Sequence, residues 1–128
     1  MSDDIRSAAE ELLYKYGAIA DAKDIPAALK FFQNATVSFP QRTVAGSEQL
    51  TELYSELWGK PNSHRHIITN VRVTKVVLGY SATALYTRWE FTPAPLLTTM
   101  GEYEMAFSRH ESHWAVDSLV VTRSWPVG

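Results

Sequence analysis

Residues 64–73 read HRHIITNVRV, a stretch rich in β-branched residues that begins with two histidines separated by one arginine. Because Val, Ile and Thr favour extended backbone, this stretch predicts a strand. A strand that buries one face seldom begins with an imidazole by chance, and histidine is the side chain whose charge changes near neutral pH. His66 is therefore a candidate for proton transfer, provided that it faces a pocket.

From this stretch onward, the chain reads as a series of strands. The pattern predicts four long strands, at residues 64–78, 81–92, 97–109 and 113–124. The connections at Gly79-Tyr80 and His110-Glu111-Ser112 are short, so successive strands should pair antiparallel.

The chain before residue 64 has helical spacing instead. Apolar residues recur at three- and four-residue steps from Asp4 to Ala22, which predicts a first helix. Asp24 precedes Ile25-Pro26, a good N-cap followed by proline in the first turn, and predicts a short second helix that ends near Phe32.

A strand near residues 35–39 and a third helix complete this half of the chain. The third helix begins at Gly46 and ends at Gly59-Lys60-Pro61. Three helices followed by a long antiparallel sheet predict an α+β fold, with the helices packed on one face of a curved sheet.

Composition predicts one globular domain over residues 1–128, since 45% of the residues are hydrophobic and 20% are charged. A net charge of −2 and the lack of any Lys/Arg run argue against nucleic acid as a partner. Without cysteine there is no disulfide, thiolate metal site or cysteine nucleophile. No apolar run has membrane length and the N-terminus is acidic, so we expect no membrane association and a cytoplasmic location.

Several short motifs, in order and spacing, carry a resemblance to a known family. They are Tyr16-x4-Asp21-x2-Asp24, Ala35-Thr36-Val37, Gly46, Arg65-His66-x2-Thr69-Asn70-Val71, Gly101-x-Tyr103, Trp114 and Val120-Val121-x3-Trp125. With these motifs the chain resembles the SnoaL-like members of the nuclear transport factor 2-like superfamily. The resemblance implies a cone-shaped, cystatin-like α+β fold with a deep pocket between sheet and helices, and a homodimer formed through the outer face of the sheet.

Within this superfamily, the constellation of candidate site residues resembles that of dehydratases of the bile-acid 7α type. In that site a tyrosine, an aspartate five residues later and a histidine on the first long strand face one another, and Tyr16, Asp21 and His66 match them. The same resemblance implies Glu90 and Arg123 as further polar members of the site.

Two other relatives match only in part. Tyr16 matches the oxyanion-binding tyrosine of ketosteroid isomerases, but Phe39 occupies the position of their aspartate base. Asp21 and His66 match a catalytic pair of scytalone dehydratase, whereas two of its tyrosines correspond to Ala20 and Phe39. Neither mechanism carries over whole.

The chemistry of the trio can be stated from its residue types. A carboxylate behind an imidazole fixes its tautomer and raises its basicity, so Asp21 and His66 can act as a base while Tyr16 donates to a developing oxyanion. We therefore expect a cofactor-independent dehydratase or isomerase acting on a cyclic, apolar, oxygenated small molecule. The residues expected to contact that ligand are Phe39, Tyr54, Trp58, Glu90, Tyr103 and Arg123.

Two other classes of function fit the sequence. One is a non-catalytic ligand-binding or accessory subunit. The other resembles the superfamily's epoxide hydrolases and would use Arg88, Glu90 and Asp117, although a cross-strand ion pair on the outer face also explains the first two. A metal site at His64, His66 and Glu90 lacks diagnostic spacing and His64 resembles an exposed loop residue, so we predict no metal.

Overall fold

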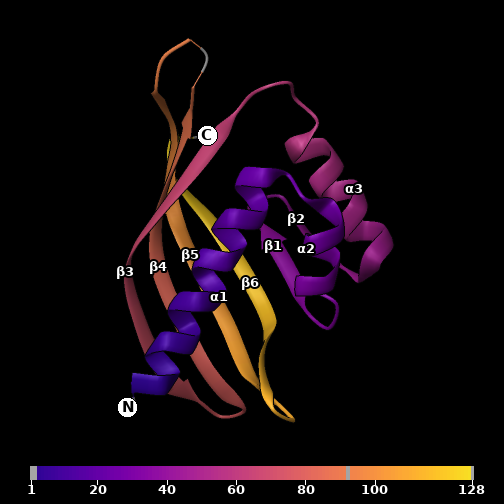
Figure 1. Cartoon of the computed structure of the whole chain (residues 1–128), viewed down its shortest axis with the longest axis vertical. Helices are drawn as coiled ribbons and strands as arrows, with labels where there is room; N and C mark the ends of the chain where they lie inside the picture. The colour runs from indigo at the N-terminus through magenta and orange to yellow at the C-terminus, as the bar shows by residue number, and fades with distance from the viewer. Residues whose placement is uncertain (1–2, 92, 128) are drawn as a thin grey trace.

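The structure, a computed structural model, describes residues 3–91 and 93–127. Within these ranges, three helices and six strands form one α+β unit (Figure 1). The helices are α1 (Asp3–Ala22), α2 (Ile25–Phe31) and α3 (Gly46–Trp58). The strands are β1 (Thr36–Phe39), β2 (Arg42–Ala45), β3 (His64–Val76), β4 (Gly79–Glu90), β5 (Leu96–His110) and β6 (His113–Trp125).

The predicted α+β fold class is confirmed, and each predicted helix and long strand is present with ends shifted by no more than two residues. Position 92, included in one predicted strand, lies outside the described residues. The sequence reading missed β2, which pairs with β1 across the short turn at Pro40-Gln41. Four residues are too few to display an alternating pattern, so β2 is recognisable only from its pairing.

The six strands form one curved, open sheet in the order β2-β1-β6-β5-β4-β3. The predicted antiparallel pairing of the four long strands is confirmed. Strands β1 and β2 also pair antiparallel, whereas β1 and β6 run parallel. The parallel pair arises because α3 and the following loop separate the β1–β2 hairpin from the meander β3 to β6. Register shifts in the β3–β4, β4–β5 and β5–β6 pairs mark irregular positions of the type that bends strands.

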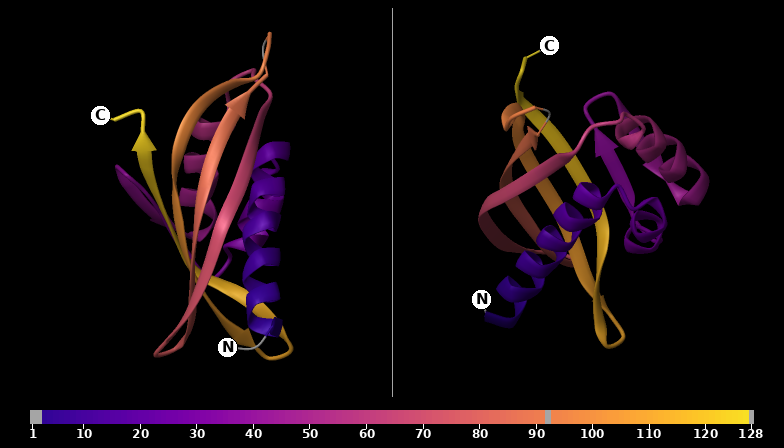
Figure 2. Two further views of the ribbon diagram at one scale, coloured as in Figure 1. Left: turned by 90° about the vertical axis from the view of Figure 1, so that its left-hand side faces the viewer. Right: turned by 45° about the horizontal axis from the view of Figure 1, so that its top comes forward.

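Helix α1 lies across the concave face of the sheet and runs beside β3, while α2, α3 and the β1–β2 hairpin lie at one side (Figure 2). The side chains buried between helices and sheet form the core. Its largest fully buried members are Tyr54, Phe32, Phe107, Leu13, Leu50, Met105, Leu119 and Val37. None of the helices in the described ranges combines the length and apolar character that crossing a membrane requires.

Candidate active site

A cavity of about 370 Å³ opens between the C-terminal end of α1, the loop after α3 and the inward face of the sheet. Its lining includes two members of the predicted trio, Tyr16 and His66. Five of the six predicted ligand contacts also line it, namely Phe39, Trp58, Glu90, Tyr103 and Arg123. The cavity therefore gathers residues from five strands and two helices that are far apart in the sequence.

Strand pairing explains why these residues meet. His66 is the cross-strand partner of Arg88, and Tyr86 pairs with Gly101, which in turn pairs with Arg123. Because side chains alternate between faces, residues in register share the inward face of the sheet. Gly101 leaves room for the Tyr86 ring, since a Cβ at this position would lie 2.8 Å from the Tyr86 hydroxyl.

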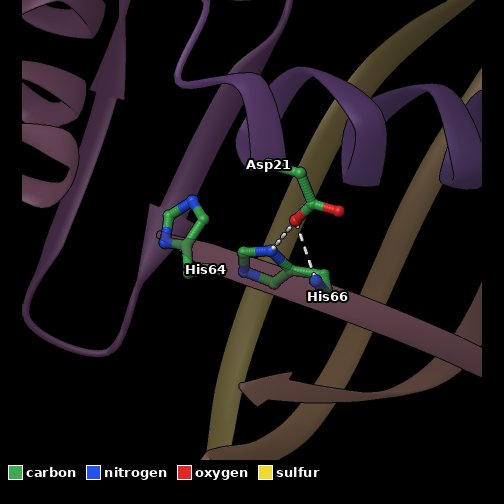
Figure 3. Close-up of side chains that lie close together, drawn as sticks. All are labelled: Asp21, His64 and His66. Carbon is green, nitrogen blue, oxygen red and sulfur yellow. Dashed lines mark hydrogen bonds and ion pairs between the residues drawn. The ribbon is translucent and has the colours of Figure 1, made fainter. Parts of the chain in front are cut away.

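Asp21 and His66 form a close pair at one wall of the cavity (Figure 3). The Asp21 Oδ1 atom accepts two hydrogen bonds of 2.8 Å, one from His66 Nδ1 and one from the His66 backbone N–H. A carboxylate oxygen only accepts, so the ring proton resides on Nδ1. Nε2, which has no partner among the described residues, is then the nitrogen available to a ligand.

This pair is shielded from solvent. The side chain of His66 is 9% exposed and that of Asp21 is 25% exposed. Asp21 itself does not line the cavity and instead lies behind the imidazole that does. A hydrogen bond to a charged partner in such surroundings is stronger than the same bond in water.

Tyr16 is almost fully buried, and its hydroxyl lies 3.1 Å from the hydroxyl of Tyr54. Tyr54 is not among the residues that line the cavity, which differs from the direct ligand contact predicted for it. Its hydroxyl is instead connected to the cavity through the hydrogen bond with Tyr16. Burial raises the pKa of Tyr16, while its hydrogen bond with Tyr54 acts in the opposite direction. Burial likewise raises the pKa of Tyr54. Both hydroxyls are therefore neutral donors at ordinary pH.

Two further tyrosines extend this cluster. The rings of Tyr86 and Tyr103 stack with centroids 4.3 Å apart, and Tyr103 packs edge-on against Tyr16. Burial raises the pKa of both hydroxyl groups. In the described part of the chain neither hydroxyl has a hydrogen-bond partner, yet no buried polar side-chain atom is left unpaired, so both hydroxyls open onto the cavity. Tyr86 was not predicted as a site residue, although it lies two positions before Arg88 on the same strand face.

His64 occupies a different place from the one expected. We predicted an exposed loop residue, but His64 is only 6% exposed and lines the cavity as the first residue of β3. Its Nε2 atom lies 2.6 Å from the carbonyl oxygen of Ala20, and its Nδ1 atom lies 3.0 Å from a guanidinium nitrogen of Arg88. Burial lowers the pKa of His64, with the neighbouring charges of His66 and Arg88 adding to the effect. The ring is thus held neutral.

Arg88 and Glu90 face the cavity and not the outer face of the sheet, so that expectation was wrong. They form an ion pair of 2.7 Å, and the hydrogen bond from Arg88 lowers the pKa of Glu90. Asp117 does not join them: it is 40% exposed and lies 3.3 Å from His110. The three residues of the hydrolase hypothesis therefore do not converge.

The donor atoms of Asp21, His64 and His66 lie within 4.8 Å of one another, a spacing that a metal ion can use. The hydrogen bonds argue against that use. Both nitrogens of His64 are already engaged, and the guanidinium beside its Nδ1 atom repels a cation. Glu90, the third ligand of the site considered from the sequence, is bound to Arg88. The geometry is that of a hydrogen-bonded cluster.

The fold and the cavity define a class of protein: an α+β protein whose curved sheet and helices surround a cavity lined by histidine, tyrosine, arginine and glutamate side chains. The chain belongs to the SnoaL-like domain family, whose model matches residues 4–120. No curated protein sequence matches the chain.

Solved structures share this fold. ActVI-ORFA from Streptomyces coelicolor superposes with a TM-score of 0.83 at 12% identity, covering 93% of this chain and 97% of that one. A nuclear transport factor 2-like protein with a cystatin-like fold from Novosphingobium aromaticivorans gives 0.79 at 15% identity, covering 98% and 85%. A candidate scytalone dehydratase from the same organism gives 0.77 at 12% identity, covering 96% and 89%. At these identities the similarity demonstrates the nuclear transport factor 2-like, cystatin-like fold.

Proposed function

We propose that this protein is a cofactor-independent lyase or isomerase that acts by general acid–base chemistry on a cyclic, largely apolar, oxygenated molecule. The observation that carries the proposal is the hydrogen-bonded pair of Asp21 and His66, with Nε2 of His66 left for a ligand at the cavity wall. The family relationship supports small-molecule chemistry, and one structure with the same fold is that of a candidate scytalone dehydratase.

The base in this proposal is Nε2 of His66. It takes a proton from a carbon next to a carbonyl group, and the electron pair of that C–H bond moves into the carbonyl to form an enolate. Asp21, bound to Nδ1, stabilises the imidazolium that results. His66 then returns the proton to a departing β-hydroxyl, which leaves as water, or to a second carbon, which completes an isomerisation.

The enolate oxygen needs hydrogen-bond donors, and the tyrosine cluster provides them. If Tyr54 donates to the Tyr16 oxygen, the Tyr16 hydroxyl proton is free to point at the ligand. The Tyr86 and Tyr103 hydroxyls open onto the same cavity. Donors fixed in place before the reaction stabilise developing charge with little reorganisation, and a single such donor is worth about 10²- to 10³-fold in rate.

The cavity walls favour a ring-containing ligand. Phe39, Trp58 and Tyr103 present flat faces, and the volume of about 370 Å³ is at the small end of the usual range for ligand pockets. Arg123, on the last strand, lines the cavity close to Tyr86, where its charge favours an oxygen that becomes negative.

The first prediction tests turnover. We expect the wild-type protein to convert at least one member of a panel of cyclic β-hydroxy ketones and steroids, and we expect His66→Ala to lose about 10²- to 10⁴-fold of that rate because the base is gone. Mass spectrometry of the products measures both. His113→Ala, which removes an exposed histidine of β6, is the matched control and should keep the wild-type rate.

Two results count against the proposal. Turnover that survives His66→Ala unchanged excludes the role of His66. Tight binding of panel members without any conversion would identify a non-catalytic ligand-binding protein instead.

A further inference from the structure

Two imidazole rings of strand β3 form hydrogen bonds with the C-terminal end of helix α1. His64 binds the carbonyl oxygen of Ala20, and His66 binds the carboxylate of the next residue, Asp21. The two histidines are alternate residues of β3, and their rings lie edge to face with centroids 5.1 Å apart. Figure 3 shows the Asp21 carboxylate directed at His66, with the His64 ring beside it. The two contacts lie too close together to be independent of each other.

The partners of His64 determine where its proton is. The Ala20 carbonyl oxygen only accepts a hydrogen bond, so His64 Nε2 carries the proton. The Arg88 guanidinium only donates, so His64 Nδ1 carries a lone pair. One form of the ring satisfies both contacts, the neutral imidazole protonated on Nε2. This is the opposite tautomer from that of His66, whose Nδ1 atom carries the proton.

These contacts leave His64 no nitrogen for a ligand, although its ring lines the cavity. They do fix two groups that the proposed reaction uses. The bond to Ala20 holds the last turn of α1, and with it Asp21, at a set distance from β3. The hydrogen bond to His64 Nδ1 holds one terminal nitrogen of the Arg88 guanidinium, and the other terminal nitrogen donates to Glu90 and Thr98.

We propose that His64 is a positioning residue: its neutral, Nε2-protonated ring sets the register between α1 and β3 and thereby holds the Asp21 carboxylate against His66. The inference rests on the proposed acid–base function of that pair, but its first test needs no substrate. A displacement of about 1 Å in such a site can lower the rate about 10²-fold.

Burial and the neighbouring charges lower the pKa of His64, while its hydrogen bond to the Ala20 carbonyl acts in the opposite direction. Arg88 from β4, Lys23 from the end of α1 and any charge on His66 oppose protonation, while Glu90 is neutralised by Arg88 and Asp21 is engaged with His66. We therefore expect nitrogen NMR of the histidine rings in the wild-type protein to show His64 neutral and protonated on Nε2 across about pH 5 to 8, the range in which free histidines titrate. Protonation of His64 within that range, or a proton on Nδ1, would overturn the proposal.

Two substitutions separate the two contacts of His64. In His64→Gln the side-chain amide nitrogen takes the place of Nε2 and can still donate to Ala20. In His64→Asn the amide oxygen takes the place of Nδ1 and can still accept from Arg88, but the side chain is too short to reach Ala20. His64→Phe retains the ring and loses both hydrogen bonds.

The readout is the hydrogen-exchange rate of the His66 Nδ1–H proton, observed by NMR in variants whose folding is checked by circular dichroism. We expect His64→Gln to keep the slow exchange of the wild type, and His64→Asn and His64→Phe to exchange at least about tenfold faster. Wild-type exchange in His64→Phe would overturn the proposal. If a variant fails to fold, the tautomer of His64 measured by NMR in the wild-type protein still tests the proposal.

Turnover gives the second readout once a panel substrate is known. We expect His64→Phe to lower kcat about 10²-fold with little change in KM, and His64→Gln to restore most of kcat. If neither His64 nor His66 variants change turnover, the proposed function fails even when the exchange data support the positioning. If His66→Ala abolishes turnover and His64→Phe does not, the positioning role alone is wrong.

Discussion

At the scale of single residues, the proposed base, His66, lies near a group of buried tyrosine hydroxyls that stay neutral. The neutral state follows from burial: Tyr16, Tyr54, Tyr86 and Tyr103 all have raised pKa values because the tyrosinate form would lose its hydration. A hydroxyl that keeps its proton can donate to an oxyanion over the whole range in which His66 works as a base.

The second prediction concerns these tyrosines. In the unfolded chain they ionise near a pKa of about 10, whereas in the folded protein the pKa is higher. The free energy of the unfolded state therefore falls as the pH rises past about 10, and the stability that is complete below this pH is lost progressively above it. A titration of tyrosinate absorbance should show the four buried tyrosines, Tyr16, Tyr54, Tyr86 and Tyr103, ionising only with unfolding. Ionisation of all six tyrosines near pH 10 in folded protein would contradict this.

The sequence could indicate His66 because the residue interrupts a β-branched stretch, a local signal. It could not indicate the burial of His64, because the partner that buries it, the Ala20 carbonyl, lies 44 positions earlier in the chain. Tyr86 was missed for a similar reason: its access to the cavity depends on the absent side chain of Gly101 on the neighbouring strand.

At the scale of elements, helix α1 carries two members of the site, and the tight turn after it fixes where the helix ends. Lys23 adopts a left-handed conformation with φ of 52°, and its ammonium group binds the carbonyl oxygens of Lys60 and Asn62 in the loop at the cavity mouth. Asp24 then caps α2 by accepting from the backbone N–H of Ala27 at 3.1 Å. The predicted cap is confirmed.

The third prediction follows from this cap. We expect Asp24→Ala to lower the free energy of unfolding by about 1 kcal/mol, because the first turn of α2 loses the acceptor of its N–H group. This corresponds to a fall in Tm of about 4 °C for a chain of this size. Thermal unfolding followed by circular dichroism measures it. Glu11→Ala, an exposed position of α1, is the control and should change stability by less than about 0.5 kcal/mol. An equal effect of the two substitutions would contradict the role of the cap.

Helices and strands could be predicted from the sequence where the spacing of their apolar residues repeats over many positions. The periodicity of α1 and the four long strands repeats often enough to be read from the chain. The β1–β2 hairpin and the parallel pairing of β1 with β6 depend on contacts between distant segments, so the local sequence carries little of that information.

At the scale of the whole molecule, the sheet has two unlike faces. The inward face carries the cavity, and the outward face carries exposed apolar side chains at alternate positions, including Ile67, Leu85 and Met100. Charged residues such as Glu102 and Glu104 lie among them on β5. Exposed apolar side chains gathered on one face are typical of an association surface.

The fourth prediction is that the protein forms a homodimer through this outward face. Light scattering after size-exclusion chromatography should give twice the chain mass of 14.4 kDa. Leu85→Glu should yield a monomer, because it introduces a charge at the centre of the interface. Leu78→Glu, at the exposed β3–β4 turn, is the control and should remain dimeric. A monomeric wild-type protein would exclude this assembly.

The central claim is that the pair of Asp21 and His66 removes a proton from carbon, and the fifth prediction addresses it directly. The measurement is the incorporation of solvent deuterium next to the carbonyl group of a panel of cyclic ketones, followed by mass spectrometry in D₂O. With the wild-type protein we expect deuterium incorporation well above the uncatalysed rate. We expect His66→Gln to lower the rate of incorporation about 10²- to 10⁴-fold. Asp21→Asn should cause a smaller loss, because it keeps the imidazole base but removes the carboxylate that stabilises the imidazolium. Incorporation by His66→Gln at the wild-type rate would contradict the account.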